Sequence, residues 1–194
     1  GVQTCALPIS ALGLVAGVER PALAVSVPTR RGASLLIDAG ANVDCRPDHL
    51  AQFGVMGAAF ASVGFGLDAP RVGLLSIGEE AGKGNEVTKA AFGLLSAAPV
   101  HFVGNIDAAQ WFSGDADVVV ADGFVGNIAL KVGEAVVEMV AAHLPPEARA
   151  RLHYAETGGA PLVGVNGVAV IGHGRSPATA IANGIAYTAR LAEG

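Results

Sequence analysis

The clearest structural signal in the sequence is Asp117-Val-Val-Val-Ala-Asp-Gly123, which leads directly into the longer stretch from Phe124 to Val140. The first part is a short apolar run, which is typical of a strand buried on both faces of a parallel sheet. The second part repeats apolar residues at spacings of three and four, which predicts a helix with one apolar face. A strand that feeds a helix in this way is the repeating unit of an α/β fold.

The same alternation of strand and helix extends on both sides of this unit. Further helices are predicted from Pro47 towards Phe65, around Val87–Leu95 and around Ile181–Ala189, and a helical excursion follows Pro145. We therefore predict a doubly wound, mostly parallel α/β sheet. The other predicted strands are Ser34–Gly40, Val72–Gly78, Val100–Asn105 and Val168–Gly174.

Composition excludes several other classes of protein. Of 194 residues, 52% are hydrophobic and 15% charged, which excludes a disordered chain. The 27 glycines show no three-residue period, so the chain is not collagen-like. The net charge of −5 without a basic stripe argues against nucleic acid as a partner. Two cysteines provide neither a disulfide framework nor a zinc site, which favours a reducing, cytoplasmic compartment.

The N-terminal segment calls for a separate interpretation. No charged residue occurs from Gly1 to Val18, but a basic flank is lacking and Pro8 interrupts the apolar run, which argues against a signal peptide or a membrane span. Gly1–Ile9 resembles one reading frame of a sequencing-library adapter. We therefore expect residues 1–10 to be non-native and residues 11–194 to be the C-terminal part of a single domain.

Chemistry is expected at the carboxyl ends of the strands, where an open parallel sheet binds its ligands. The richest of these loops is Gly78-Glu-Glu-Ala-Gly-Lys-Gly-Asn-Glu86, in which Lys83 stands between two glycines just before a helix. Its ammonium is placed to meet an anion at the helix N-terminus. The spacing does not match a nucleotide-binding P-loop, which needs four residues between its first two glycines and a hydroxyl after the lysine. A solvated lysine in a turn is the alternative.

Three other loops have a similar composition. Asp122-Gly-Phe-Val-Gly-Asn127 offers backbone N–H groups to phosphate and the Asn127 amide to a ligand, although Asp122 is equally suited to cap the helix. In Asp38-Ala-Gly-Ala-Asn-Val-Asp44, Asn42 either donates to a ligand or shapes the turn. In Gly172-His-Gly-Arg-Ser-Pro177, His173 is either a proton-transfer or anion-contacting residue or a solvated loop residue.

Taken together and in order, seven passages resemble the bacterial phosphate acyltransferases of phospholipid synthesis. The resemblance covers nearly everything from Ala11 onwards. The passages are Leu36-Ile-Asp-Ala-Gly-Ala-Asn-Val-Asp-Cys-Arg-Pro-Asp-His-Leu50, Pro70-Arg-Val-Gly-Leu-Leu-Ser-Ile-Gly78, Lys83-Gly-Asn-Glu-Val-Thr-Lys89, Phe102-Val-Gly-Asn105, Asp122-Gly-Phe-Val-Gly-Asn127, Tyr154-Ala-Glu-Thr-Gly-Gly-Ala-Pro-Leu162 and Ile171-Gly-His-Gly174.

This resemblance implies transfer of an acyl group from acyl carrier protein to inorganic phosphate, yielding an acyl phosphate. It also implies a three-layer α/β/α fold like that of isocitrate and isopropylmalate dehydrogenases, a homodimer, and neither metal nor nicotinamide cofactor. It makes Lys83 the expected catalytic residue. The expected phosphate- and substrate-binding residues are Asn42, Gly78, Gly84, Asn85, Glu86, Asp122, Gly123, Gly126, Asn127, His173 and Gly174.

The chain departs from the family pattern in two places. An N-terminal part that the family assigns to the same site is missing, so we expect the fragment to be inactive alone. The helical excursion that the family uses for dimer contact and reversible membrane docking is short, and Pro145–Leu152 is polar. The expected location is therefore the cytoplasm, with peripheral contact at the membrane as a weaker alternative.

Three rival interpretations stay open. A Rossmann-like nucleotide-binding module would need G-x-G-x-x-G, and Gly172–Pro177 lacks the third glycine. A dehydrogenase of the same fold class would need clustered aspartates for a divalent metal, and the sequence shows no such cluster. Glu79, Glu80 and Glu86 are either metal ligands or solvated acids, and the spacing of these three carboxylates fits no metal cage. The third interpretation is a fragment without any activity.

Overall fold

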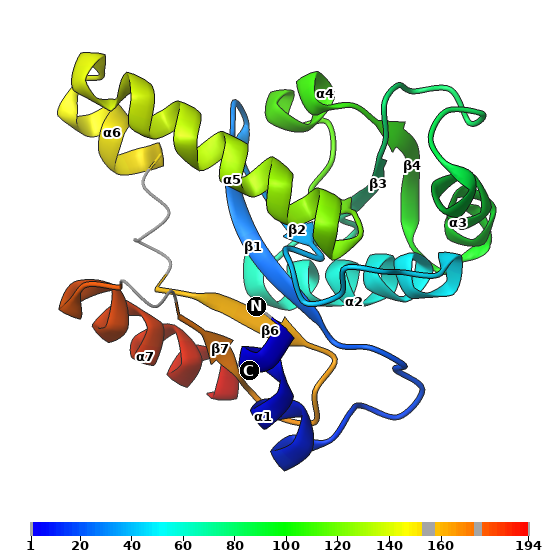
Figure 1. Cartoon of the computed structure of the whole chain (residues 1–194), viewed down its shortest axis with the longest axis horizontal. Coiled ribbons are helices and arrows are strands. Elements are labelled where there is room, and N and C mark those ends of the chain that lie inside the picture. Colours follow the sequence, from blue (N-terminus) through cyan, green and yellow to red (C-terminus); the bar gives the residue numbers. More distant parts are fainter. Residues whose placement is uncertain (1, 153–157, 173–175, 194) are drawn as a thin grey trace.

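The computed structural model describes residues 2–152, 158–172 and 176–193. The helices and strands alternate over most of this length, as Figure 1 shows. In chain order they are α1 (Val2–Leu12), β1 (Ala22–Thr29), β2 (Gly32–Ile37), α2 (Pro47–Phe65), β3 (Arg71–Leu75), α3 (Glu86–Ala97), β4 (His101–Ile106), α4 (Ala108–Ser113), β5 (Val118–Val120), α5 (Gly123–Val140), the 3-10 turn η1 (Ala141–His143), α6 (Pro146–Leu152), β6 (Ala160–Val163), β7 (Val170–Ile171) and α7 (Ala178–Glu193).

The described strands form one mixed sheet of seven, in the order β4-β3-β5-β2-β1-β6-β7. The pairs β4–β3, β3–β5 and β5–β2 are parallel, whereas β2–β1, β1–β6 and β6–β7 are antiparallel. The prediction of a mostly parallel sheet is therefore correct only for the half of the sheet formed by β4, β3, β5 and β2. The other half turns antiparallel because β1 and β2 are joined by a tight hairpin, which only antiparallel strands allow.

Most of the predicted elements are present. The strands β2, β3 and β4 overlap the predicted apolar runs, differing from them by a few residues at the ends, and β5 lies within its run. Helices α2, α3, α5 and α7 cover the predicted helical stripes. Val168–Gly174 contributes only the two-residue strand β7, and its last two residues lie outside the described part of the chain. The strands β1 and β6 and the short helix α4 were not among the predicted elements.

The parallel half of the sheet is buried on both faces, as the apolar runs predict. Successive residues of β5 alternate between the two faces: Val118 and Val120 pack with α2 and α3, and Val119 packs with α4 and α5. Two glycines of α2 allow close packing, Gly57 against the sheet and Gly54 against α3. A Cβ on Gly57 would lie 2.7 Å from a methyl carbon of Val118, and one on Gly54 would lie 2.5 Å from Leu95. Small residues thus determine the distance between helix and sheet.

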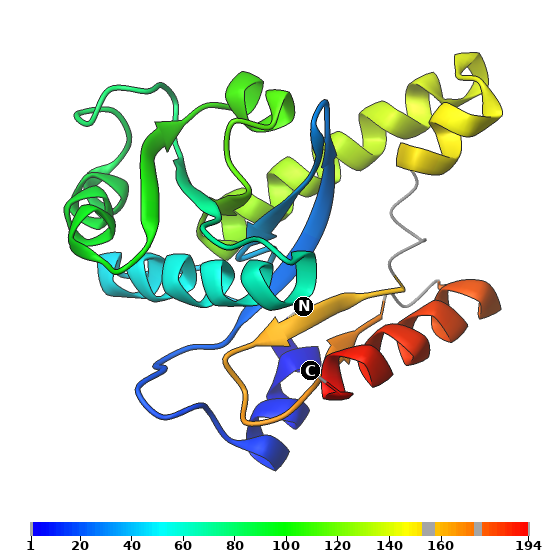
Figure 2. The same ribbon diagram turned by 180° about the vertical axis from the view of Figure 1, so that it is seen from behind.

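The two ends of the sheet look different in Figures 1 and 2. At one end, β3 and β4 are flanked by helices. At the other end, β6 and β7 lie with α1 and α7. Helix α5 runs outwards from the sheet, and α6 lies beside its far end. No helix in the described residues is both long and apolar enough to cross a membrane.

Candidate functional site

Three of the predicted loops meet at one edge of the sheet because the strands before them are parallel neighbours. The loop after β2 contacts the end of β5, where the backbone N–H of Asp38 donates to the carbonyl oxygen of Ala121 at 3.0 Å. The loop after β3 is held to β4 by a 2.9 Å hydrogen bond from the N–H of Ser76 to the carbonyl oxygen of Ile106. The structure therefore brings the Asp38, Lys83 and Asp122 loops to a common edge.

A small cavity of about 160 Å³ lies between the first turns of α3 and α5. Both helix N-termini therefore flank it, and the partial positive charge of a helix N-terminus favours an anion. The residues that line the cavity are Leu75, Ser76, Ile77, Gly84, Asn85, Thr88, Ala121, Asp122 and Val125. Three of the predicted site residues, Gly84, Asn85 and Asp122, are among them.

In the first turn of α3, the predicted site residues mainly stabilise the backbone of the helix. The Asn85 side chain accepts from the N–H of Thr88 at 2.9 Å and so caps the helix. Gly84 has a φ of +102°, and a Cβ there would overlap the Thr88 hydroxyl, so only glycine suits this position. The side chain of Glu86 is 96% exposed and forms an ion pair with Lys89 at 3.7 Å, away from the cavity lining.

Ser76 lines the cavity but was not among the predicted site residues. Its hydroxyl oxygen is buried and has no hydrogen-bond partner in the described structure. A buried polar group without a partner is costly, so a ligand or water at this position would satisfy it. The only sequence signal was the place of Ser76 directly after a predicted strand.

Lys83 is exposed, and its aliphatic stem runs beside Gly78, where an added Cβ would lie 3.5 Å from its Cγ. The backbone of its loop is held in place: the carbonyl oxygen of Glu80 accepts from the N–H of Lys83 at 2.9 Å and from Nδ2 of Asn105 at 2.8 Å. No acceptor in residues 2–152, 158–172 or 176–193 pairs with the Lys83 ammonium. The ammonium is therefore available to a ligand that approaches the start of α3.

The loop Asp122–Asn127 packs against the loop after β2. The Asp122 carboxylate caps α5 by accepting from the N–H of Val125 at 2.8 Å. The N–H of Gly123 donates to the carbonyl oxygen of Asn42 at 2.8 Å, and a Cβ on Gly126 would overlap the carbonyl oxygen of Asp38. The Asn127 amide donates to the carbonyl oxygen of Ala39 at 3.3 Å. The two glycines and Asn127 thus allow a close approach between helix and loop.

Asn42 is also engaged within the protein. It is 8% exposed, and its side-chain Nδ2 donates to the carbonyl oxygen of Pro21 at 2.8 Å and to Asp38 at 2.9 Å. Asp38 is fully buried, and its carboxylate also accepts from the N–H groups of Leu23, Gly40, Ala41 and Asn42. This arrangement makes Asp38 the organising group of the loop, a role that the sequence analysis had not given it.

The remaining predicted residues do not complete a cluster. His173 and Gly174 lie outside the described residues. Within the described ranges, no group of three or more His, Cys, Asp or Glu side chains is placed to hold a metal ion.

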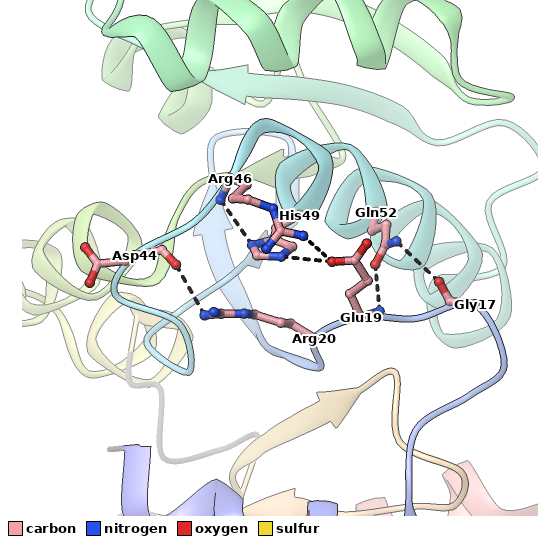
Figure 3. A network of polar contacts seen from close by, with 7 residues as sticks. All are labelled: Gly17, Glu19, Arg20, Asp44, Arg46, His49 and Gln52. Atoms are coloured by element: carbon pink, nitrogen blue, oxygen red, sulfur yellow. Dashed lines mark hydrogen bonds and ion pairs between the residues drawn. The ribbon is translucent and has the colours of Figure 1, made fainter.

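A second polar cluster lies near the loop after β2, where Glu19 meets the start of α2 (Figure 3). The Glu19 carboxylate pairs with Arg46 and lies 3.3 Å from Nε2 of His49. Nδ1 of His49 accepts from the N–H of Arg46 at 3.1 Å, so the proton of the neutral ring lies on Nε2. Burial, with Arg46 and Arg20 nearby, lowers the pKa of His49. We interpret this cluster as a set of structural contacts that holds the segment before β1 against the start of α2.

Comparison with known proteins gives a consistent result. The family model described as fatty acid synthesis protein matches residues 3–148. A phosphate acyltransferase from Desulforudis audaxviator (strain MP104C) is 50% identical over 94% of this chain and 60% of its own length. A second phosphate acyltransferase, from Pelotomaculum thermopropionicum, is 48% identical over 90% of this chain and 57% of its own length. This chain therefore spans about 60% of the length of these curated relatives.

Solved structures support the fold. A phosphotransacetylase from Streptococcus pyogenes aligns with 96% of this chain and 58% of its own, with a TM-score of 0.69 and 19% identity. At that identity the likeness shows that the two chains share an α/β architecture with helices on both faces of the sheet.

Proposed function

The chain belongs to the fatty acid synthesis protein family, and we propose that it provides the phosphate-binding part of an acyltransferase site. The reaction moves an acyl group from acyl carrier protein to inorganic phosphate and yields an acyl phosphate for phospholipid synthesis. The observation that carries this proposal is the cavity between the N-termini of α3 and α5, with the Lys83 loop at its border.

Inorganic phosphate fits the size and the donors of this cavity. A volume of about 160 Å³ suits a small anion, whereas pockets for larger ligands usually measure about 300–1,000 Å³. The first N–H groups of a helix have no partner within it, so backbone N–H groups at the starts of α3 and α5 can donate to an anion between them. The Ser76 hydroxyl can donate a further hydrogen bond, and the Asp122 carboxylate can accept the proton of hydrogen phosphate. This size also disfavours a nucleotide as the ligand.

The chemistry needs positioning more than activation, because phosphate is already a nucleophile. A phosphate oxygen attacks the thioester carbonyl, a C–O bond forms, and the C–S bond breaks to release the thiolate of the carrier. Backbone donors hold the phosphate in line with the carbonyl. The Lys83 ammonium stabilises the charge that develops on the oxyanion or the departing sulfur. No serine or cysteine nucleophile is needed in this scheme.

The other predicted site residues are assigned supporting roles. Asn42, Gly123, Gly126 and Asn127 place α5 against the loop after β2, and so determine where the N-terminus of α5 points. Gly78 lies beside the stem of Lys83. The predicted roles of His173 and Gly174 stay predictions.

We further propose the finer features that the family resemblance implies. These are a fold of the isocitrate and isopropylmalate dehydrogenase type, a homodimer, acyl carrier protein as a partner and a cytoplasmic location. The apolar side chains of Ile128, Val132, Val136 and Met139, all exposed on α5, support a partner subunit on that helix.

Phosphate binding tests the proposal directly. In the wild-type chain, inorganic phosphate is expected to shift the amide NMR signals of Glu86 and Val87. Lys83→Met should weaken this binding about tenfold or more, because a charge-assisted hydrogen bond is lost. Lys89→Met is the matched control, since Lys89 is also an exposed lysine near the start of α3 but pairs with Glu86. Phosphate shifts that are absent, or equal in both variants, would refute the site.

Turnover is tested by release of thiol from acylated carrier protein, with and without phosphate, in an enzyme of the relatives' full length. Release is expected only with phosphate and is expected to be lost in the variant that corresponds to Lys83→Met. Thiol release that does not depend on phosphate would refute the proposed reaction, even if phosphate binds.

A further inference from the structure

The two helices that flank the proposed phosphate cavity are capped in the same way by different residues. The Asn85 side chain caps α3 by accepting from the N–H of Thr88 at 2.9 Å, and the Asp122 side chain caps α5 by accepting from the N–H of Val125 at 2.8 Å. Both capping residues line the cavity. The cavity therefore has an amide on its α3 side and a carboxylate on its α5 side.

Each cap uses only one end of its side chain. In the described part of the chain, Nδ2 of Asn85 has no acceptor and Oδ2 of Asp122 has no donor. An amide nitrogen can only donate a hydrogen bond, whereas a carboxylate oxygen can only accept one. An anion between the two helices thus meets a donor side chain at α3 and an acceptor side chain at α5.

Capping alone does not require the negative charge of Asp122. Asparagine caps a helix about as well as aspartate does, and Asn85 fills this role at α3. Asp122 is the one ionisable side chain among the described residues that line the cavity. A carboxylate repels an anion that offers it no proton, because both are negatively charged. Its place in this lining therefore favours an anion that carries a hydrogen-bond donor.

We propose that Asp122 makes this cavity selective for inorganic phosphate over sulfate. The inference rests on the proposed function and names the group that determines the choice of anion. At neutral pH the phosphate dianion retains one P–OH group, whereas the sulfate dianion of the same charge and similar size has only acceptor oxygens. Phosphate can donate its proton to Oδ2 of Asp122 in a charge-assisted hydrogen bond, and sulfate cannot.

The same hydrogen bond orients the phosphate. Its protonated oxygen faces Asp122, so its ionised oxygens face the start of α3. The Asn85 amide lies on that side, and so does the buried, unpartnered Ser76 hydroxyl, 3.2 Å from the position that a Cβ on Gly84 would take. An ionised oxygen is the better nucleophile. Asp122 thus determines specificity and also places a nucleophilic oxygen on the side of the Lys83 loop.

The wild-type chain provides the first test, by calorimetric titration with sodium phosphate and with sodium sulfate at equal ionic strength. We expect phosphate to bind about tenfold more tightly than sulfate or better, because sulfate leaves the carboxylate without a donor. Arsenate also retains a proton at neutral pH and should be preferred over sulfate in the same way. Equal affinities for phosphate and sulfate would overturn the proposal.

Asp122→Asn is the decisive variant, because asparagine keeps the cap of α5 but presents a donor where Oδ2 stood. We expect sulfate to bind this variant at least as tightly as phosphate. Asp107→Asn is the matched control, since Asp107 caps α4 by accepting from the N–H of Gln110 at 2.9 Å and lies outside the cavity lining. It should keep the wild-type preference. A preference for phosphate that survives in Asp122→Asn would overturn the proposal.

Lys83→Met separates this inference from the proposed function. It should weaken the binding of both anions, because an ammonium attracts either one, and should leave the ratio of the two affinities near the wild-type value. Equal binding of phosphate and sulfate that Lys83→Met weakens would leave the phosphate site in place and remove only the role of Asp122. Absence of phosphate binding in the wild type would refute the site itself, and with it this role.

Discussion

The side-chain amide of Asn105 donates to the carbonyl oxygen of Glu80 at 2.8 Å, and this bond ties the end of β4 to the loop that carries Lys83. Asn105 is 4% exposed, whereas Glu80 and Lys83 are exposed. The same carbonyl accepts the N–H of Lys83. A buried residue of the sheet thus positions an exposed loop.

Removal of this bond should loosen the loop. Asn105→Ala leaves the Glu80 carbonyl with one donor fewer, and a lost hydrogen bond of this kind costs about 1 kcal/mol. We expect faster hydrogen exchange at the amide of Lys83, measured by NMR. Asn166→Ala, at an exposed asparagine outside the site, is the control. Unchanged exchange at Lys83 would show that the loop is held by other contacts.

Substitution by alanine should have opposite effects on the free energy of unfolding at two glycines of α5. Gly126→Ala forces a Cβ into the carbonyl oxygen of Asp38, and overpacking of this kind costs about 1–3 kcal/mol or more. Gly133→Ala meets open space and should raise the free energy of unfolding by about 0.5–1 kcal/mol, because alanine favours a helix. Urea unfolding of both variants measures the two values. Equal effects would mean that the contact with Asp38 does not limit the position of α5.

The free energy of unfolding should fall in acid because the Asp117 carboxylate becomes protonated. Burial would raise the pKa of this carboxyl, but the hydrogen bonds from the guanidinium and backbone of Arg71 outweigh burial and lower it. Because the native pKa is below the unfolded value of about 3.9, the unfolded chain binds more protons between the two values. The contribution is therefore complete above about pH 5 and is lost as the pH falls through the native pKa.

The matched variant isolates this contribution. Asp117→Asn loses one charged partner of Arg71 and should lower the free energy of unfolding at neutral pH by about 1.5–3 kcal/mol. The difference between wild type and variant should shrink as the pH falls below about 4. A difference that stays constant from neutral to acid pH would contradict the assigned ionisation of Asp117.

The thiol of Cys45 should react slowly with alkylating reagents. Burial raises its pKa to about 11, with Asp38 and Asp122 adding to the effect and a hydrogen bond from Gly123 opposing it. In the Cys5→Ser variant Cys45 is the remaining cysteine. Its alkylation at pH 8 should be about a hundredfold slower than in urea, because the thiolate is the reactive form. The rate should keep rising with pH beyond pH 9. A plateau near pH 8.5 would refute the raised pKa.

The elements of the fold were predictable wherever local periodicity was strong. Pro47 at the first position of a helix and the apolar run Val118–Val120 gave α2 and β5 correctly. The strand β1 was missed, and with it the antiparallel half of the sheet, because its pairing depends on the hairpin with β2 and on β6, which is more than 130 residues away along the chain. Residues that pair across such distances leave no local pattern.

The candidate site, like the fold, was predictable from the sequence only in part. Local composition was sufficient to place the loops after β2, β3 and β5 at one edge, because parallel strands present their carboxyl ends together. Only the folded chain shows which polar groups remain free there. Asn42 and Asn127 give their side-chain donors to backbone carbonyls of Pro21 and Ala39, whereas the Ser76 hydroxyl has no partner in the described structure. Periodicity and turn chemistry are properties of neighbouring residues, but the partner of a hydrogen bond and the volume of a cleft depend on how distant elements pack.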